Sequence, residues 1–260
     1  MKRVLHEPAF VLHRYDWSES SLILEVFTRR QGRTALVAKG AKRPSSNFRP
    51  VLLPLQPLHL NYSADGEIGT LKSAEWAGGH VMPVGEALLS GYYLNELLMR
   101  LLARDDPHPA LFDAYALTVA SLTAPEEGTG SQGDWIQAVL RAFELVLLRQ
   151  IGVLPALDAQ TLTQRPLQDA APYLLTAESG LREAQDEEGG PARASLGGSE
   201  WRLIDEALCD PAPQQALIAL CLRRKDISLA LKNQLRTVLL YHCGGNPLRT
   251  RQLLLELQKL

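Results

Sequence analysis

Cysteine is scarce in this sequence, and its three copies, Cys209, Cys221 and Cys243, are 12 and 22 positions apart. An odd number at these intervals fits neither a disulfide framework nor the paired C-x-x-C spacing of a structural zinc site. We therefore expect reduced, buried cysteines of the kind found in cytosolic proteins. No metal site is predicted.

Long apolar runs are missing as well. No stretch reaches the length of about 18 apolar residues that a membrane-spanning helix needs. At the N-terminus, Glu7 and Pro8 interrupt the chain before an apolar run of secretory length develops. These absences predict no membrane span, no signal peptide and a cytoplasmic location. With 260 residues, 46% of them hydrophobic, the chain can form two ordinary domains.

The motifs of common enzymes are absent too. We find no P-loop, G-x-S-x-G, H-E-x-x-H or EF-hand pattern, and the six histidines are scattered. Residues 128–133 match G-x-G-x-x-G, but the acidic segment Ala124-Pro-Glu-Glu127 precedes them where a dinucleotide site needs a buried strand. We interpret them as a flexible linker and expect no enzyme and no cofactor. A hydrolase whose site is assembled from distant residues is kept as an alternative.

Acidic residues are absent between Val26 and Ala64. The same segment contains seven cations, Arg29, Arg30, Arg33, Lys39, Lys42, Arg43 and Arg49. Because the whole chain has a formal charge of −2, setting this +7 segment aside leaves −9 for the remainder. Such an asymmetry attracts polyanions, of which nucleic acid is the commonest.

Four of these cations, Lys39, Lys42, Arg43 and Arg49, follow the apolar run that begins at Thr34. Gly40 and the Pro44-Ser-Ser segment between them leave backbone N–H groups and hydroxyls free to approach phosphate oxygens. We predict a DNA-binding loop. The alternative is a solvated turn that protects a sheet edge from pairing with another sheet.

Five short segments before residue 77 have the character of β-strands. They are Ala9–Tyr15, Ser20–Thr28, Arg33–Lys39, Leu52–Tyr62 and Glu67–Trp76, with glycine turns at Gly32 and Gly66 and with Pro54 and Pro57 inside the fourth. Five strands in about 70 residues favour a small closed barrel, of OB type or of SH3-like type. Aromatic residues here could stack on bases: Tyr15, Trp17, Phe27, Phe48 and Tyr62.

Helical periodicity begins at Val84 and predicts an α+β protein. Helices are expected from Val84 to Asp105, from Pro109 to about Leu122, from Trp135 to Ile151 behind an Asp134 cap, and over Leu203–Leu208, Gln214–Leu222, Ser228–Tyr241 and Leu248–Leu260. The predicted domains are a nucleic-acid-binding barrel over residues 1–80 and a helical domain over 81–260. A loop-rich insertion is expected at about 155–200.

A second cationic region lies near the C-terminus. Lys232 and Arg236 share a face of one predicted helix, and Arg249 and Arg251 lie in the first turn of the last one. We consider these four residues a second DNA-contact surface, with an ordinary solvated face as the alternative.

Several blocks of the chain resemble the bacterial DNA repair protein RecO family. They are the strand and loop Val37–Ser46, Tyr93–Leu98, Leu111–Asp113, Phe143–Arg149 with Gly152, and Gly244–Arg251, in family order. The resemblance implies an N-terminal OB-fold and a recombination mediator that anneals complementary strands. With RecR, such a protein helps RecA displace single-strand-binding protein (SSB). Many relatives carry four zinc-binding cysteines near residue 158, and here Asp158-Ala-Gln-Thr161 has none.

The resemblance also implies partners: single- and double-stranded DNA, RecR and the acidic tail of SSB. Such a tail needs a hydrophobic groove beside a cation, for which Arg141 and Arg149 are the candidates. We expect a cytoplasmic, nucleoid-associated protein. An RNA-binding or translation-associated barrel is the alternative, because the same cations would bind either polymer.

Overall fold

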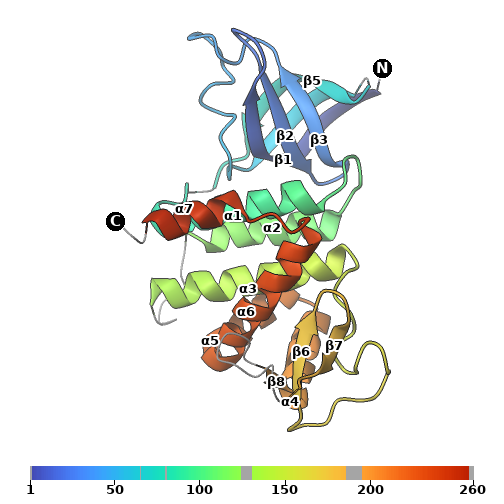
Figure 1. The fold of residues 1–260 in the computed structure, drawn as a ribbon. Helices are drawn as coiled ribbons and strands as arrows, with labels where there is room; N and C mark the ends of the chain where they lie inside the picture. The colour runs from blue at the N-terminus through green and yellow to red at the C-terminus, as the bar shows by residue number, and fades with distance from the viewer. Residues whose placement is uncertain (1, 65, 80, 124–130, 186–194, 258–260) are drawn as a thin grey trace. The chain divides into compact units, whose positions relative to one another are not determined.

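The computed structural model describes residues 2–64, 66–79, 81–123, 131–185 and 195–257 (Figure 1). The chain forms two compact units, one of Met1–Thr123 with Arg249–Leu260 and one of Ala124–Leu248. These units divide the chain at places other than the boundary near residue 80 that we derived from the sequence. That boundary marks the change from strands to helices and stays a prediction.

The first unit begins with a closed barrel of five strands, β1 (Lys2–Asp16), β2 (Leu22–Thr28), β3 (Gly32–Ala38), β4 (Leu58–Ala64) and β5 (Ile68–Trp76). Around the barrel the order is β1-β2-β3-β5-β4, and only the β3–β5 pairing is parallel. This is an OB-type barrel, and with the helices that follow it confirms the predicted α+β class.

The first strand closes the barrel because it bends. Its first part pairs with β4 and its second part with β2, and the register shifts between Val4 and Glu7 and between Val11 and His13. Such bulges bend a strand and increase its twist. His6, in the first bulge, has a left-handed backbone with φ of 49°. A bent strand of 15 residues can thus pair with β4 on one side and with β2 on the other, which closes the barrel.

The fourth strand begins later than its sequence predicts. We expected a strand from Leu52, whereas β4 begins at Leu58. Pro54 and Pro57 lack the N–H that a continuous ladder requires, so the segment before Leu58 forms only an isolated bridge between Pro54 and Val11. Leu52 and Leu55 are instead buried as side chains.

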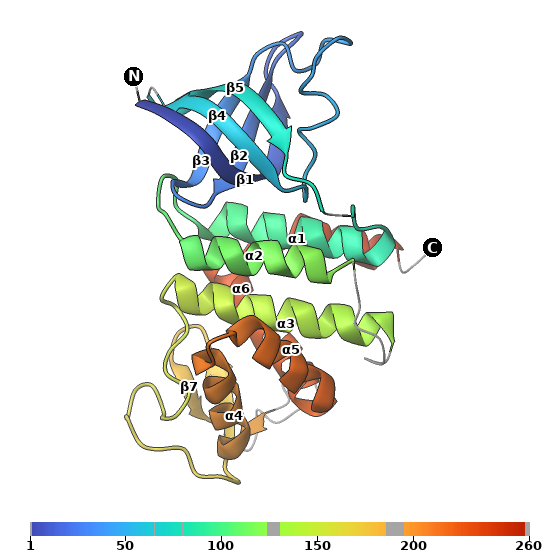
Figure 2. The ribbon, with the colours of Figure 1, turned by 180° about the vertical axis from the view of Figure 1, so that it is seen from behind.

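Two helices of the same unit lie against one end of the barrel, α1 (Gly85–Leu101) and α2 (Pro109–Ser121) (Figure 2). Phe10 of the barrel packs edge-on against Tyr115 of α2 at a centroid distance of 5.0 Å. The Tyr115 hydroxyl donates to Asn95 Oδ1, and Asn95 Nδ2 donates to the carbonyl of Leu12 at 3.1 Å. Satisfied polar groups of this kind make the packing of barrel against helices specific.

The β2–β3 turn approaches the loop between α1 and α2 too closely for any side chain at Gly32. A Cβ there would lie 2.0 Å from the carbonyl oxygen of Asp106, and the φ of Gly32 is +75°. Beside it, the Asp105 N–H donates to the carbonyl of Arg33 at 2.8 Å. Glycine is therefore required on both steric and conformational grounds.

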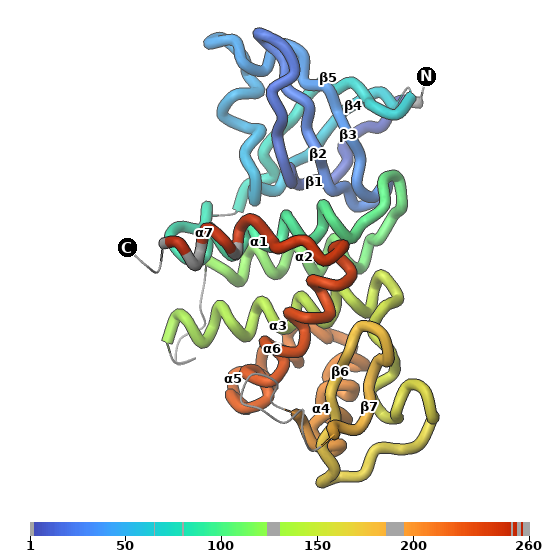
Figure 3. The backbone as a smooth tube through the Cα atoms, in the orientation of Figure 1, coloured from blue at the N-terminus to red at the C-terminus, as the bar shows by residue number. Residues whose placement is uncertain are grey.

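The last helix, α7 (Arg249–Leu257), lies beside α1 within this unit (Figure 3). Its first N–H groups find an acceptor on α1, since the Glu96 carboxylate accepts from the N–H groups of Arg249 at 2.9 Å and Thr250 at 3.0 Å. The Thr250 hydroxyl also donates to it, at 2.8 Å. A carboxylate placed there satisfies the unpaired donors of a helix N-terminus.

The second unit contains α3 (Gln132–Gln150), α4 (Gly198–Cys209), α5 (Pro213–Arg223) and α6 (Lys225–His242). A small sheet of order β7-β6-β8 joins them, made of β6 (Pro172–Thr176), β7 (Gly180–Glu183) and β8 (Leu196–Gly197). We expected a loop-rich insertion at about 155–200 and predicted no sheet there. The sheet was missed because its strands have five, four and two residues, too few for a periodicity to show.

Three local expectations in this unit need correction. The cap of α3 is Ser131, whose side chain accepts from the Asp134 N–H, and Asp134 itself lies in the first turn. Of the cysteines, Cys221 is buried but Cys209 is exposed. Of the proposed linker at 128–133, residues 128–130 lie outside the described residues. The remainder is not a linker, because Ser131 caps α3 and Gln132 and Gly133 lie in that helix.

Candidate nucleic-acid interface

The cationic loop between β3 and β4 is a chain of consecutive turns. The N–H groups of Ala41, Arg43, Ser46 and Arg49 each donate to a carbonyl three residues earlier, at 3.0 to 3.4 Å. Gly40 permits the first turn, with φ of +72°. This hydrogen bonding gives the loop a defined path, so its cations project from fixed backbone positions.

Contacts with the barrel hold this loop at both ends. The Lys42 N–H donates to the carbonyl of Ser20 at 2.9 Å, and Arg14 Nη1 on β1 donates to the carbonyl of Leu52 at 3.2 Å. Phe48 and Val51 pack against the barrel core. The loop is thus part of the barrel surface, and its charges are held beside the ends of β1 and β2.

Three loop cations, Lys39, Arg43 and Arg49, are exposed. Within the part of the chain that the structure describes, none of these three takes part in an ion pair. Lys42 forms one with Asp16 at 3.4 Å, and the Asp16 side chain is 82% exposed. A pair so open to solvent contributes little energy, so Lys42 can exchange Asp16 for a phosphate at small cost.

A cleft of about 500 Å³ opens between the loop and the end of β1. Its lining is cationic at Arg14, Lys42 and Arg49, acidic only at Asp16, and apolar elsewhere: Leu22, Ala41, Phe48 and Leu52. Sequence reasoning missed Arg14 because it lies in β1, before the acid-free segment. The signal that could have found it is an arginine among the outward-facing residues of a strand that ends beside the loop.

The aromatic residues proposed to stack on bases divide into two groups. Phe27 and Tyr62 are buried in the barrel, and burial raises the pKa of Tyr62 to about 12. Tyr15 and Trp17 are exposed, at the end of β1 and just beyond it. Phe48 is partly buried and lines the cleft. Only the last three can therefore reach a strand bound at this surface.

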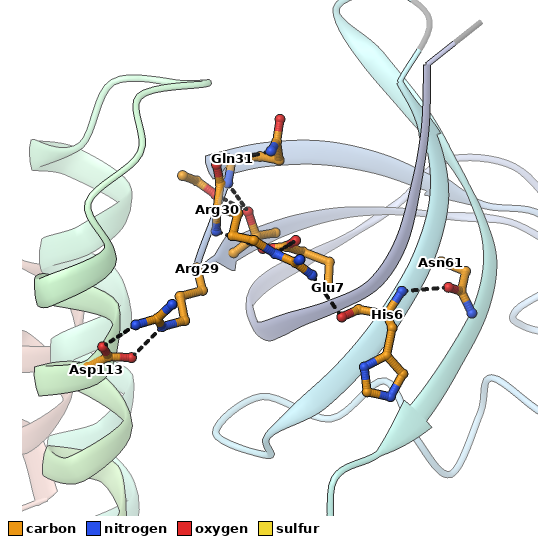
Figure 4. Close-up of polar contacts among 9 residues, drawn as sticks. His6, Glu7, Arg29, Arg30, Gln31, Asn61 and Asp113 are labelled. Carbon is orange, nitrogen blue, oxygen red and sulfur yellow. Dashed lines mark hydrogen bonds and ion pairs between the residues drawn. The ribbon is translucent and has the colours of Figure 1, made fainter.

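Two other cations of the acid-free segment, Arg29 and Arg30, are paired (Figure 4). The Arg29 guanidinium makes a two-pronged contact with Asp113 of α2, both hydrogen bonds at 2.8 Å, and this contact raises the pKa of Arg29. Arg30 Nε donates to the buried carboxylate of Glu7 at 2.7 Å. In the same close-up, the His6 N–H donates to Asn61 Oδ1.

Arg33 is the third paired cation. Its Nη1 lies 3.6 Å from a carboxylate oxygen of Glu25, which is only 2% exposed, and donates to the carbonyl of Met99 at 3.0 Å. Arg104 also donates to Glu25. These bonds give Arg33 a structural role between the barrel and α1. We therefore centre the proposed DNA surface on the loop residues and Arg14, and we keep the C-terminal cations as a second candidate surface.

The C-terminal cations belong to different units. Lys232 and Arg236 are exposed on α6 of the second unit, and Arg249 is exposed at the start of α7 in the first. The side chain of Arg251 lies outside the described residues. Elsewhere on α6, Lys225 pairs with Asp134 at 2.8 Å.

The two arginines proposed for partner binding have different environments. Arg141 is not a surface cation: it is 6% exposed, and its guanidinium donates to the equally buried Glu144 at 2.6 Å. Arg149 is half-buried and pairs with Asp205 at 3.2 Å. Arg141 was misplaced because α3 is buried nearly all round, so its polar residues lie inside as well.

The second unit has a cavity of about 320 Å³ between the β6–β7 hairpin and α6. Apolar groups of Leu174, Leu175 and Tyr241 line it together with Arg182 and Glu178. The sequence did not predict this cavity, because the hairpin that forms one wall lies in the segment that we expected to be rich in loops.

The described residues were compared with the requirements of a metal site and of a membrane-spanning helix. Over the described ranges, no three histidine, cysteine, aspartate or glutamate side chains gather closely enough to hold a metal ion. None of the helices in those ranges combines the length and apolarity needed to cross a membrane.

The fold and this surface define a protein that joins an OB-type barrel with a cationic loop to a helical region. The family models for the N-terminal and C-terminal parts of recombination protein O match residues 1–80 and 82–252. The chain therefore belongs to the recombination protein O family, and this membership supports a role in recombinational DNA repair.

Relatives match over nearly their whole length. The protein named DNA repair protein RecO from Variovorax paradoxus is 61% identical over 259 residues, 99% of this chain and 98% of that protein. Those of the same name from Polaromonas sp. and Verminephrobacter eiseniae are 59% and 60% identical, each over 100% of this chain and over 99% and 98% of their own.

Proposed function

We propose that this chain is a non-enzymatic DNA-binding mediator of recombinational repair. It anneals complementary strands and, with RecR, assists the loading of RecA on single-stranded DNA coated by SSB. The observation that carries the proposal is the cationic loop: Lys39, Arg43 and Arg49 project from a rigid barrel without acidic partners among the described residues, and Lys42 has only an exposed one. Family membership supplies the biological setting.

Charge neutralisation explains how such a protein can act without hydrolysing anything. Two complementary strands repel each other through their phosphates, and a cation that binds a phosphate releases its counterions and lowers that repulsion. Contacts to phosphate carry no sequence information, so any complementary pair would be accepted. No nucleotide and no metal ion takes part.

The decisive experiment measures annealing of complementary oligonucleotides, free and coated with SSB. We expect the purified protein to accelerate both reactions without nucleotide or metal. The triple variant Lys39→Ala, Arg43→Ala and Arg49→Ala should lose most of the acceleration. A control of equal charge change, Lys72→Ala with Arg165→Ala and Arg223→Ala, removes exposed cations outside the proposed DNA surfaces and should retain it. Annealing no faster than without protein would overturn the proposal.

For the SSB tail, the cavity beside α6 meets the requirements better than the site first considered at Arg141 and Arg149. An acidic tail that ends in apolar residues needs an apolar pocket beside a cation. Leu174, Leu175 and Tyr241 provide the apolar wall, and Arg182 provides the charge. We therefore transfer the proposed docking site for this partner to the cavity, with Arg149 as a residue outside it.

The exposed pair Lys232 and Arg236, with Arg249 and Arg251, is proposed as a secondary DNA contact. It would account for residual affinity after loop substitution. We place the protein in the cytoplasm with the nucleoid, where DNA and RecR are present.

RNA is the alternative polymer, because the loop cations would bind either one. Competition between DNA and RNA oligonucleotides of equal length decides between them. Preference for DNA, or no preference, agrees with the repair function, and a strong preference for RNA would favour a translation-associated barrel protein.

A further inference from the structure

We propose that the cleft between β1 and the cationic loop holds one unpaired nucleotide of a single strand. Its base would lie against the apolar floor and its phosphate at the cationic rim. This inference rests on the proposed function and deepens it, since it assigns the loop surface a preference for unpaired DNA and gives a role to Arg14, which lies outside the loop.

The size and composition of the cleft suit such a ligand. Its volume of about 500 Å³ is within the range of small-ligand pockets, about 300 to 1,000 Å³. Its apolar floor consists of Leu22 and Phe48, which are partly exposed, and of Ala41 and Leu52, which are only 1% exposed each. The planar face of a nucleobase can cover this floor while its polar edges stay in contact with water, and Phe48 is the aromatic residue of the lining.

The rim favours an anion in a fixed position. Arg14 is held by its Nη1 hydrogen bond to the carbonyl of Leu52, which orients the guanidinium and leaves its remaining N–H groups as donors. Arg49 lies on the same cleft with no ion pair among the described residues. Asp16 is the acid of the lining, and Lys42 neutralises it at 3.4 Å. The net charge of the lining is +2.

Access to the floor requires that the base be unpaired. A base inside a duplex is stacked, and removing it costs a few kcal/mol, whereas a base in a single strand is available at little cost. Contact through the face of a base is tolerant of sequence, because every base has a π-face. A loop that bound phosphate alone would bind a normal single strand and an abasic strand equally well.

The test compares two single-stranded oligonucleotides of equal length, oligothymidylate and a strand with the same phosphates but abasic sugars. The intact protein should bind oligothymidylate at least about fivefold more tightly, which corresponds to the lower end of base-stacking contributions. Equal, salt-dependent affinity for both would overturn the nucleotide cleft and leave the proposed function standing. Failure to bind either would overturn the proposed function itself.

Variants then test whether the preference for oligothymidylate over the abasic strand arises in the cleft. Phe48→Leu removes the aromatic face from the cleft without changing charge, so it should lower affinity for oligothymidylate and leave the abasic strand unaffected. Arg49→Ala should weaken both ligands by the same factor, and so should the control Lys39→Ala, which lies outside the cleft. Leu22→Ala serves as a second floor variant if Phe48→Leu unfolds. A folded floor variant that keeps the full preference for bases would refute the assignment.

Discussion

The buried carboxylate of Glu7 accepts two hydrogen bonds from Arg30, one from the backbone N–H and one from Nε, both at 2.7 Å. Glu7 is 1% exposed, and Arg30 supplies both of these hydrogen bonds. Arg30, which we predicted from the sequence to contact DNA, therefore forms hydrogen bonds with a buried carboxylate of the barrel.

Removing that partner should affect stability and not DNA binding. Arg30→Ala leaves the buried Glu7 carboxylate with fewer donors, and an under-satisfied buried group of this kind costs about 1 to 3 kcal/mol. Urea denaturation should show this loss in the free energy of unfolding, while affinity for DNA and its salt dependence stay unchanged at a temperature where the variant is folded. A folded variant with a flatter salt dependence would return Arg30 to the DNA surface.

The loop should show the opposite behaviour. Each phosphate neutralised on single-stranded DNA contributes about −0.7 to the slope of log affinity against log salt, so Lys39, Lys42, Arg43 and Arg49 together contribute roughly −3. Changing all four to alanine should flatten the slope by that amount across unrelated sequences. The free energy of unfolding should shift by less than about 0.5 kcal/mol per residue, because these side chains are on the surface. An unchanged slope would make Lys232, Arg236 and Arg249 the leading DNA surface.

Arg141 and Arg182 make contrasting predictions for a peptide with the acidic, apolar-ended sequence of an SSB tail. Arg141→Ala breaks a buried ion pair with Glu144 and should destabilise the protein by about 3 to 5 kcal/mol. Arg182→Ala should leave stability nearly unchanged and weaken the peptide, as measured by fluorescence anisotropy. If Arg182→Ala binds the peptide normally, the cavity beside α6 is not the docking site.

The stabilisation of α7 by the Glu96 carboxylate should depend on pH. Burial pushes the pKa of Glu96 upward, but hydrogen bonds from the Thr250 and Arg249 N–H groups and the Thr250 hydroxyl, with the charge of Arg100, outweigh it and lower the pKa below its usual value. A lowered folded-state pKa means stability that is full above the ordinary glutamate pKa and lost as pH falls through the folded value. Hydrogen exchange of the amides in α7, corrected for intrinsic rates, should accelerate in that acidic range.

Substitution separates this titration from general acid unfolding. Glu96→Ala should give fast exchange in α7 already at neutral pH, with exchange in β2 and β3 unchanged. Glu96→Gln keeps one acceptor and should give intermediate protection that no longer depends on pH. Slow exchange in α7 of Glu96→Ala would contradict the role assigned to Glu96.

Chelators should have no effect on folding or on DNA binding. Cys209, Cys221 and Cys243 cannot reproduce a four-thiolate site, and within the described ranges no group of metal-binding side chains is present. Thermal unfolding with and without EDTA, and metal analysis of the untagged protein, test this expectation. Stoichiometric zinc would disprove it.

Much of the architecture followed from the sequence alone. Alternating apolar residues with glycine turns predicted five strands, and the helical period from Val84 predicted most of the helices that follow, because these patterns are local and repeat over many residues. The sequence did not predict the late start of β4 or the short strands β6–β8. Prolines shorten β4, and β6, β7 and β8 have too few residues to show an alternating apolar pattern.

The chain by itself determined where its positive charge is concentrated, since no acid interrupts residues 26–64. Only the tertiary structure decided which of those cations are available. Glu7, Glu25 and Asp113 come from outside the segment and pair with Arg30, Arg33 and Arg29. Folding also brings Arg14 to the loop and buries Arg141. The physical reason is that charge density is a property of neighbours along the chain, whereas pairing and burial depend on neighbours in space, which strand register and helix packing select.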